Sequence, residues 1–518
     1  MEGVASASRG TQEEAAAERA RFGALQAELS DRFERFRKDP TLPYTAVVVP
    51  SQSVDPKELR KLAGAAHYEE RSLFNLMLLR YPRLKVVFVT SKRLDPLIVD
   101  YYLHQMRGIP PGHARRRLLL FDCDDASPRP LTAKLLERPR LLERIREAID
   151  EPAMAHLNVF NSSPLERALA VQLGIPLNAC DPDLTWLGTK TGARRAFADA
   201  GVPVPPGRDG LRDFGDLVEA VAELWAEVGD ARRLVVKLDD SFSGEGNGIL
   251  ELDYVTARGD SAVARARAVR EALPRMRLEA AGLDWEEYRA QFDRMGGICE
   301  LWLEGQGKTS PSAQFRINPL GDVLPVSTHD QVLGGPSGQV FQGACFPADQ
   351  RYRLTIQELG RRIGAVLAGH GVIGRFGVDY LYIPDADPGG AGRVYALEIN
   401  LRQGGTTHPF NTLKFMTDGR YDEESGRFFT AQGRERAYFA TDNLVSPAYR
   451  GILPFDLIDT LVLNGTHFRA DETGVLFHML GCLSEFGKLG ATAIAPDVAE
   501  ARALYQDTVR LLDQMAAR

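Results

Sequence analysis

The stretch VDYLYIPDADPGGAGRVYALEIN, residues 378–400, predicts a β-hairpin. Its two ends, 378–383 and 394–400, are rich in β-branched, aromatic and aliphatic residues, as strands are. Between them, residues 384–393 consist mostly of Pro, Asp, Gly and Ala, which is the composition of a turn. The two strands should therefore run antiparallel, with side chains alternating between two faces.

One face of this hairpin carries two carboxylates and an amide. If Ile383 pairs with Val394, then Asp379 lies opposite Glu398, and Asn400 lies on the same face. Like charges placed opposite each other are destabilising unless a cation neutralises them, and such hard oxygen ligands suit Mg²⁺. We therefore expect this face to bind a metal; the alternative is that a nearby arginine pairs with the acids. The opposite face should be core, with Val378, Tyr380, Leu397 and Ile399.

A second stretch, LVVKLDDSFSGEGNG at residues 234–248, has the features of an anion-binding loop. An apolar strand, expected at Arg233–Leu238, carries Lys237 near its end and leads into a loop of Ser and Gly, whose backbone N–H groups can turn inward. The lysine adds a point charge for a phosphate. The alternative is a mobile hairpin tip with a solvated lysine, and this stretch alone does not separate the two. Lys190, 47 residues before Lys237, then becomes a candidate second phosphate contact.

Length and charge are those of a globular enzyme or binding protein. The 518 residues suggest three or four structural units at roughly 150 residues each. The chain has 63 Lys and Arg against 70 Asp and Glu, a net charge of −7, which offers no electrostatic case for binding nucleic acid. No apolar run approaches the roughly 20 residues of a membrane helix, and the start lacks a secretory signal. We therefore expect a cytoplasmic protein without membrane or nucleic-acid partners.

The cysteines and histidines predict neither a disulfide framework nor a metal motif. The five cysteines are never spaced as CxxC, which argues against a zinc knuckle and fits a reducing cytoplasm. They are Cys123, Cys180, Cys299, Cys345 and Cys482. The nine histidines form no cluster with metal-ligand spacing. Two glycine-rich strings, at 244–248 and 305–309, match neither the dinucleotide fingerprint nor a P-loop.

Predicted strands and helices divide the chain into parts. Residues 1–39 should be a partly disordered extension, frayed over about residues 1–20. Residues 40–185 alternate helices with short, apolar strands bounded by Pro, Ser or Lys, which predicts a Rossmann-like parallel sheet. Its last helix is expected at Pro164–Leu173 and should end at Gly174. We expect this sheet to be a platform, since no dinucleotide fingerprint follows its first strand. The last part, 446–518, shows an αβα pattern, with a helix expected at Leu476–Glu485, a strand at Ala491–Ala495 and a helix at Ala499–Met515.

The order of these features resembles the ATP-grasp superfamily. The shared signature is a lysine at a domain seam, a strand lysine before a Gly/Ser loop, a hinge glutamate, and an Asp followed after 18 residues by Glu-x-Asn and an arginine. Three further strings, at 327–335, 398–409 and 487–494, are similar to those of the pheganomycin-type peptide ligases. The resemblance covers roughly residues 40–518.

The resemblance implies an α/β architecture with α+β lobes. A Rossmann-like pre-ATP-grasp domain, 40–185, would precede a two-lobed ATP-grasp domain, 186–445, and a small α/β C-terminal domain, 446–518. Within the ATP-grasp domain, residues 186–305 would include the lid and residues 306–445 would carry the metal site.

The resemblance also implies roles for individual residues. The nucleotide would contact Lys190, Lys237, Ser241, Ser243, Gly244, Gly246, Glu300, Leu301, Leu303 and Glu304. Mg²⁺ would be held by Asp379, Glu398 and Asn400. Arg402 and Lys237 would be catalytic, because they stabilise charge on the transferring phosphoryl group or on the tetrahedral intermediate.

At one position the sequence departs from the superfamily. Many members have a ribose-binding glutamate where this chain has Gly307, and Glu304 would substitute for it. Candidate substrate contacts are Arg316, His329 as a base for the attacking amine, and His408 beside the metal strand. The alternative for both histidines is a structural role.

The function that the resemblance implies is an ATP-dependent ligase that joins a small carboxylic acid to an amine, such as an amino acid or a peptide. The carboxylate would first attack the γ-phosphate of ATP, and the amine would then attack the acyl phosphate. Two Mg²⁺ ions are expected, with Mn²⁺ as a substitute, and a homodimer is one assembly to expect. The alternatives are a non-catalytic nucleotide-binding or regulatory protein and another ATP-grasp synthetase.

Overall fold

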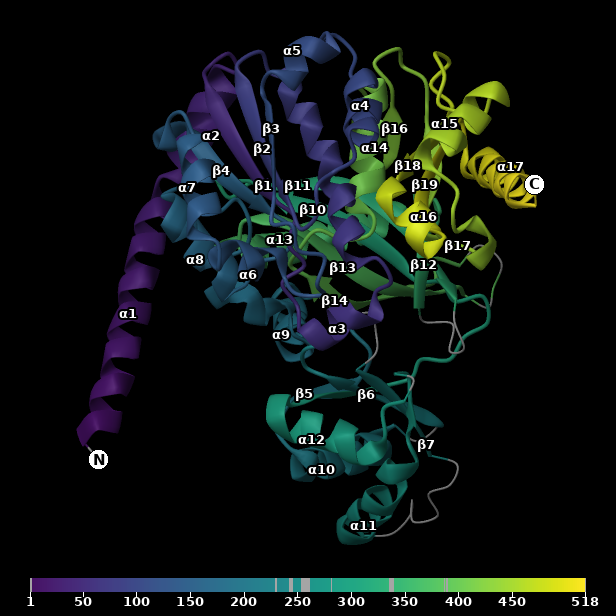
Figure 1. The fold of residues 1–518 in the computed structure, drawn as a ribbon. Helices are drawn as coiled ribbons and strands as arrows, with labels where there is room; N and C mark the ends of the chain where they lie inside the picture. The colour runs from purple at the N-terminus through teal and green to yellow at the C-terminus, as the bar shows by residue number, and fades with distance from the viewer. Residues whose placement is uncertain are drawn as a thin grey trace.

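The computed structural model describes residues 2–228, 231–241, 246–252, 261–280, 282–334, 340–385, 387 and 390–517. Figure 1 shows a broad upper body and a smaller lobe that hangs below it. The upper body combines an N-terminal unit with a large antiparallel sheet, and the smaller lobe holds a second antiparallel sheet.

The N-terminal unit is built on a four-stranded parallel sheet with the order β3-β2-β1-β4. Its strands are β1 (Tyr44–Val49), β2 (Leu84–Thr90), β3 (Leu118–Asp122) and β4 (Ala155–Val159). Helices cover both faces of β1, so that Val48 packs in one core cluster with Leu76 and Val47 in another with Leu142. The predicted Rossmann-like parallel sheet is therefore confirmed.

Helices precede and connect these strands. They are α1 (Glu2–Ala27), α2 (Leu29–Lys38), α3 (Pro56–Lys61), the 3₁₀ helix η1 (Ala65–Arg80), α4 (Pro96–His104), α5 (Pro111–Arg115), α6 (Leu131–Leu136), α7 (Pro139–Glu147), η2 (Pro152–Met154) and α8 (Pro164–Leu173). Residues 2–20, which we expected to be frayed, lie in α1. The second half of α1 contacts α8, and Phe22 is 2% exposed in the core beneath the sheet. Burial of this apolar residue gives the extension a docking point that composition alone did not indicate.

The small lobe contains a five-stranded antiparallel sheet with the order β5-β9-β6-β7-β8. Its elements are β5 (Gly207–Leu211), α10 (Phe214–Glu227), β6 (Arg233–Leu238), β7 (Asn247–Glu251), α11 (Ala262–Ala272), η4 (Leu273–Arg275), β8 (Arg277–Leu278), α12 (Trp285–Met295) and β9 (Gly297–Leu301). The helices pack on one face of the sheet, where Val236 joins Trp225 and Tyr288 in a core cluster. Alternation along β6 leaves Val235 and Lys237 on the other face.

The large sheet has eight antiparallel strands in the order β14-β13-β10-β11-β12-β17-β19-β18. Its first strands are β10 (Pro311–Ile317), β11 (Val323–Gly334), β12 (Val340–Phe346), β13 (Gly374–Ile383), β14 (Arg393–Asn400) and β17 (Ala437–Val445). The helices and short strands around it are η3 (Pro182–Gly188), α9 (Lys190–Asp199), α13 (Arg353–Gly369), α14 (Thr407–Thr417), β15 (Arg420–Asp422) and β16 (Arg427–Phe429). Helix α13 packs across β10 and β11, with Ile363 against Phe315 in one cluster. The predicted hairpin is thus the edge of a sheet whose core is covered by α13.

The C-terminal region extends this large sheet instead of forming a sheet of its own. Its elements are η5 (Pro447–Tyr449), α15 (Pro454–Leu463), β18 (Gly474–His478), η6 (Leu480–Cys482), α16 (Leu483–Phe486), β19 (Lys488–Ala495) and α17 (Val498–Ala516). The helix predicted at Leu476–Glu485 is wrong over its first turn, because β18 pairs antiparallel with β19 and places Leu476 opposite Thr492. Only η6 and α16 are helical there. The predicted strand at 491–495 and helix at 499–515 are confirmed by β19 and α17.

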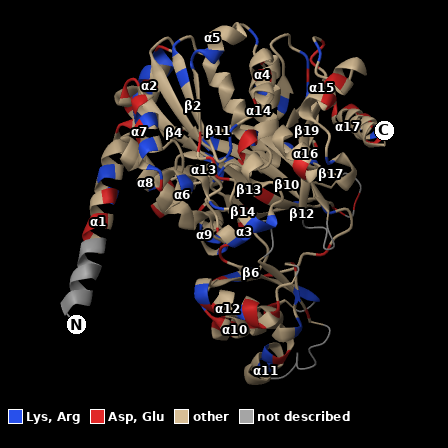
Figure 2. Ribbon diagram, in the orientation of Figure 1, with Lys and Arg blue, Asp and Glu red and all other residues tan. Residues whose placement is uncertain are grey.

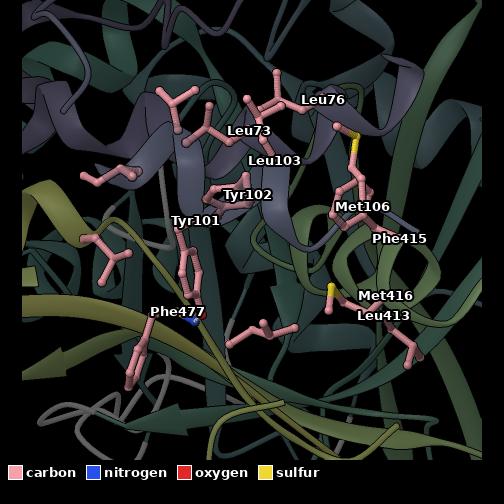
Figure 3. Packing of buried hydrophobic residues seen from close by; sticks show 14 of the residues in the cluster. Leu73, Leu76, Tyr101, Tyr102, Leu103, Met106, Leu413, Phe415, Met416 and Phe477 are labelled. Atoms are coloured by element: carbon pink, nitrogen blue, oxygen red, sulfur yellow. Dashed lines mark hydrogen bonds between the residues drawn. The ribbon is translucent and has the colours of Figure 1, made fainter. Parts of the chain in front are cut away.

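A shared apolar core joins the N-terminal unit to the C-terminal part of the large sheet. Figure 3 shows side chains of η1 and α4 above those of α14 and β18. The backbone N–H of Phe477 donates a hydrogen bond to the hydroxyl of Tyr101 at 3.3 Å, and Leu76 and Leu413 are fully buried in the same cluster. Segments about 400 residues apart in sequence are therefore packed as one body.

Charged residues are mixed over the molecule. In Figure 2 basic and acidic residues are interspersed along the helices, in keeping with the small net charge of −7. Among the described residues, no helix combines the length and apolarity that crossing a bilayer requires.

Candidate active site

A large pocket lies where the small lobe, the large sheet and the N-terminal unit meet. Its volume is about 720 Å³, within the range of small-molecule sites. The small lobe contributes Lys237 from β6, and the large sheet contributes Asp379 from β13 and Lys488 from β19. The N-terminal unit contributes Arg71 from η1. The pocket therefore depends on three parts of the chain at once.

The predicted hairpin carries its acids into this pocket, although by a different register from the one expected. The structure pairs Ile383 with Arg393, one residue before the expected Val394. A β-bulge between Asp379 and Tyr380 then shifts the register, so that Asp379 does face Glu398. The predicted pair of acids is confirmed, and the register that led to it is wrong.

Because of the bulge, one residue predicted for the core lies elsewhere. Val378, Tyr380 and Ile399 are buried, as predicted. Leu397 is instead partly exposed and lines the pocket, while Ala396 takes the core position at 1% exposed. An extra residue on β14 moves one side chain from the core to the pocket, because side chains alternate along a strand.

Amide groups hold the two carboxylates in place. The side-chain amide of Asn400 donates hydrogen bonds to Asp379 Oδ2 and to Glu398 Oε1, both at 3.1 Å. The amide of Gln331 donates to Asp379 Oδ1 at 2.7 Å. All three predicted metal ligands thus converge, and Gln331 joins the hydrogen bonds around them. Turning the amide of Asn400 about its last torsion would present its oxygen in place of its nitrogen.

The two acids have opposite electrostatic surroundings. Burial and the neighbouring Glu398 raise the pKa of Asp379 above its ordinary value. Burial acts in the same direction on Glu398, but Lys190 and Arg402 outweigh it and lower the pKa of that carboxyl. A divalent cation at this position would remove the repulsion that raises the pKa of Asp379.

Each of the two predicted lysines forms an ion pair with a different acid. Lys190, the first residue of α9, forms an ion pair with Glu398 and is 8% exposed without itself lining the pocket. Lys237 lines the pocket and forms an ion pair with Glu300. Arg194 binds the other oxygen of Glu300 at 3.3 Å. The structure therefore brings both ammonium groups to acids that border the same pocket.

The glycine-rich loop is described only at its ends. Ser243 and Gly244 lie outside the described residues. The carbonyl oxygen of Gly246 accepts hydrogen bonds from the Leu238 N–H at 3.0 Å and from the Tyr288 hydroxyl at 3.1 Å. A Cβ at Gly246 would lie 2.4 Å from that of Ser241, so only glycine fits this close approach. The base of the loop is thus fixed to the small lobe.

The predicted hinge segment crosses between the two sheets beside the pocket. Glu300, Leu301 and Leu303 line it where β9 ends and the chain passes to β10. Glu304, predicted to contact the ribose, does not line the pocket: its half-exposed carboxylate forms an ion pair with Arg233 at 2.6 Å. A salt bridge on the outer surface therefore replaces the predicted contact.

Two of the three candidate substrate residues lie outside the pocket lining. His329 is fully buried and its Nε2 lies 2.7 Å from the hydroxyl of Tyr438, away from the pocket lining. Arg316 lies 5.8 Å from the ring of Phe33 and also outside the lining. Alternation along β10 directs Arg316 toward the N-terminal unit. These two expectations are therefore corrected.

His408 lies just behind the pocket wall. It is 3% exposed and contacts Asp442, which does line the pocket. Burial lowers the pKa of His408 to about 4, so its imidazole is neutral near pH 7. For Asp442, burial is outweighed by His408 and Arg71, which keep the pKa well below its ordinary value.

Sequence reasoning missed several lining residues. They are Gln331, Arg71, Asp442, Lys488 and Lys308. Lys488 is 8% exposed and donates a hydrogen bond to the Tyr68 hydroxyl at 2.6 Å. Two of these residues stand inside the quoted strings at 327–335 and 487–494, so those strings already carried a signal.

Known proteins resemble this chain over most of its length. The sequence model of the IQCH-like ATP-grasp domain matches residues 184–274 and 275–424, and that of the PGM1 C-terminal domain matches residues 456–508. The L-propargylglycine–L-glutamate ligase of Streptantibioticus cattleyicolor is 32% identical over 492 residues, which cover 92% of this chain and 96% of the ligase. IQ motif-containing protein H of Danio rerio is 25% identical over 420 residues, 72% of this chain and 39% of that protein.

Solved structures share the fold. A biotin carboxylase from Campylobacter jejuni in complex with β,γ-ATP has a TM-score of 0.54 and 14% identity, covering 92% of this chain and 96% of its own. The ADP complex of an N5-carboxyaminoimidazole ribonucleotide synthetase has a TM-score of 0.51 and 12% identity. The match covers 91% of this chain and 98% of the synthetase chain. At such low identity these likenesses concern the arrangement of the chain alone.

Proposed function

The chain belongs to the ATP-grasp ligases, and we propose that it joins the carboxylate of one amino acid or peptide to the amine of another, using ATP. The relative from Streptantibioticus cattleyicolor is named for two amino acids, and we assign this chain the same class of substrate. The observation that supports the proposal most is the meeting of Asp379, Glu398 and Asn400 at a pocket bordered by lysine and arginine side chains.

The hairpin residues fit a Mg²⁺ site. Asp379 and Glu398 offer two carboxylates side by side, and Asn400 lies within 3.1 Å of both. The raised pKa of Asp379, caused by burial and by Glu398, reflects a repulsion between the two carboxylates that a divalent cation would relieve. Mg²⁺ held there would neutralise charge on the phosphate oxygens of the nucleotide.

The cations of the pocket wall would bind the phosphates. Lys237 extends from β6 and Arg402 follows the metal strand, so the two approach the pocket from different lobes. In phosphoryl transfer the protein mainly positions the reactants and stabilises charge. Leu301 and Leu303 offer apolar contacts to the base at the hinge between the lobes. The carboxylate substrate would then attack the γ-phosphate, and the amine would displace phosphate from the acyl phosphate.

The pocket also offers the enclosure that an acyl phosphate needs. Such an intermediate is lost if water reaches it before the amine does. Residues of the small lobe, the large sheet and the N-terminal unit all line the pocket, so its walls close from three sides.

We further propose that the enzyme works in the cytoplasm, with two Mg²⁺ or Mn²⁺ ions and as a homodimer. All five cysteines are buried and free, which suits a reducing compartment. Metal titration of activity and light scattering would test the number of ions and of subunits.

The experiment that tests the function is a substrate search with the full chain. The protein is incubated with ATP, Mg²⁺ and pooled amino acids and short peptides, and products are identified by mass spectrometry. A condensation product that equals two components minus water is expected, together with ADP and phosphate. Release of ADP should require both an acid and an amine.

Two lysine variants control this experiment. Lys237→Ala should lower turnover by at least about 10²-fold, since it removes a charge that faces the transferred phosphoryl group. Lys38→Ala, the same change at an exposed position of α2, should leave turnover unchanged. ATP bound without any product, or full activity in Lys237→Ala, would favour the regulatory alternative and overturn the proposal.

A further inference from the structure

Three buried side chains converge behind the wall of the pocket. His408 comes from α14, Asp442 from β17 and His478 from β18, and all are at most 7% exposed. His478 Nε2 lies 2.7 Å from Asp442 Oδ1, His408 Nε2 lies 3.0 Å from the same oxygen, and the two nitrogens are 2.9 Å apart. The two histidines are 70 positions apart, so no metal-ligand spacing in the sequence predicts that they meet.

Protons alone do not satisfy this triangle of atoms. If both imidazoles carry a proton on Nε2 and donate to Asp442, two donors face each other at 2.9 Å with no acceptor between them. If one Nε2 is unprotonated and accepts from the other, its lone pair faces the carboxylate oxygen at hydrogen-bond distance. Each arrangement leaves one pair of atoms in short contact with no hydrogen bond between them. A cation bound by all three atoms would instead accept the lone pair of each.

We propose that His408, Asp442 and His478 form a Zn²⁺ site, separate from the oxygen-lined hairpin. Two imidazole nitrogens and one carboxylate oxygen are a donor set typical of zinc sites with three protein ligands. The three atoms are 2.7 to 3.0 Å apart, and tetrahedral ligands about 2.1 Å from Zn²⁺ are about 3.4 Å apart, so the side chains would need to separate by about 0.5 Å to bind the ion. The hairpin, by contrast, offers only oxygen and suits Mg²⁺.

The surroundings of the cluster hold the ligands in place. Arg71 donates to the second oxygen of Asp442 at 2.9 Å, which leaves Oδ1 for the ion, as outer-shell partners do at metal sites. Gly490 pairs with His478 across β18 and β19, and a Cβ there would lie 1.9 Å from His478 Nε2. Only glycine therefore leaves room for the ring at this point.

The site ties together the parts that build the pocket. Its ligands lie on α14 and on two strands of the large sheet, and its outer partner Arg71 lies on η1 of the N-terminal unit. An ion that binds only the folded chain stabilises it. Because Asp442 and Arg71 both line the pocket, the ion fixes part of the wall without entering the proposed phosphoryl transfer.

The test is the metal content of the full-length protein, purified without a histidine tag and passed over a chelating resin after exposure to Zn²⁺. Mass spectrometry of the metal should find roughly one Zn²⁺ per chain, and Co²⁺ in its place should give the visible absorption of a tetrahedral ion. The double variant His408→Gln/His478→Gln should hold at least about tenfold less of either ion.

Two controls locate the ion. His467→Gln changes a histidine of the same region whose Nδ1 lies 3.2 Å from the Phe468 carbonyl oxygen, and it should keep the zinc. Glu398→Gln changes the hairpin site and should also keep it. Circular dichroism checks that the double variant is folded, and if it is not, the wild-type stoichiometry and the Co²⁺ spectrum decide. Sub-stoichiometric zinc without that spectrum, or full zinc in a folded double variant, would overturn the proposal and leave a hydrogen-bonded cluster.

Discussion

The pocket has two carboxylate clusters in or beside its wall, and they differ in both chemistry and origin. On the hairpin, Asp379 and Glu398 offer oxygen ligands and come from adjacent strands. In another part of the wall, Asp442 meets two imidazole nitrogens from two other elements. The first cluster is local in sequence and could be predicted from alternation, whereas the second exists only after the sheet is assembled. The two donor sets differ accordingly: the hairpin offers only oxygen, which suits Mg²⁺, whereas the second cluster adds two imidazole nitrogens, which suit the proposed Zn²⁺.

Glu398→Gln should have the largest effect and separates the two clusters. The change keeps the size of the side chain but removes the charge that Lys190 neutralises and that would bind Mg²⁺. We expect turnover to fall by at least about 10²-fold, or roughly 2.7–4 kcal/mol of lost electrostatic stabilisation. ADP release in the presence of substrates measures it. Glu304→Gln, on the outer surface, is the matched control, and equal activity of both variants would contradict the assignment.

Ile399→Ala tests the face assignment of the hairpin. Ile399 is 2% exposed in the core, so its truncation should lower the free energy of unfolding by about 3 kcal/mol. Leu397→Ala should lower the free energy of unfolding clearly less, because the bulge directs Leu397 into the pocket. Urea unfolding of the two variants measures both. Equal losses would mean that the strand keeps a regular register.

Gly490→Ala tests how tightly the histidine cluster is built. The new Cβ would lie 1.9 Å from His478 Nε2, so the ring or the strand must move. We expect this movement to lower the free energy of unfolding by about 2 kcal/mol and to release the bound zinc. Thermal unfolding and metal content are the measurements. Gly23→Ala, in α1 with nothing within 4 Å, is the control and should be neutral or slightly stabilising. An unchanged melting temperature in Gly490→Ala would show that the site is looser than described.

His329, a buried histidine outside both clusters, should make stability depend on pH. Burial lowers its pKa to about 3, whereas the unfolded value is about 6.5. The unfolded chain therefore binds a proton that the native chain does not, and stability is full above pH 6.5 and is lost as the pH falls toward 3. Between pH 6.5 and 5.5 this residue alone should account for about 1 kcal/mol.

The measurement is urea unfolding at both pH values, with and without His329→Gln. The variant should lose less stability than the wild type over this interval, by the amount given above. His104→Gln, at the exposed end of α4, should follow the wild type. If all three proteins lose stability equally, His329 does not carry its share of the acid sensitivity.

Local pattern allowed much of the fold to be predicted. The strands of the parallel sheet were clear because they are short, apolar and bounded by turn residues, and β6 was predicted with its observed ends. The end of α8 at Gly174 was predicted because a glycine with φ of 69° stops a helix. The strand β18 was missed, since its apolar residues fit a helix equally well until β19 pairs with it.

The candidate site could be predicted in part for the same reason. Asp379, Glu398 and Asn400 lie on two strands joined by one turn, so alternation alone placed them on one face. The contacts of Gln331 and Lys488 could not be derived, because they depend on which strands become neighbours in the large sheet. Glu304 and Arg316 were misplaced because surface ion pairs and packing against the N-terminal unit leave no trace in local sequence.

The sequence by itself determined the elements and the chemistry: an apolar strand that ends in Lys237, a hairpin with two acids and an amide, and free cysteines without a disulfide pattern. Only the tertiary structure decided the bulge at Asp379, the joining of the C-terminal strands to the large sheet and the meeting of His408 with His478. The physical reason is the distance along the chain over which each effect acts. Periodicity and turn composition act over a few residues, whereas these features arise from burial of apolar surface between segments far apart in the chain.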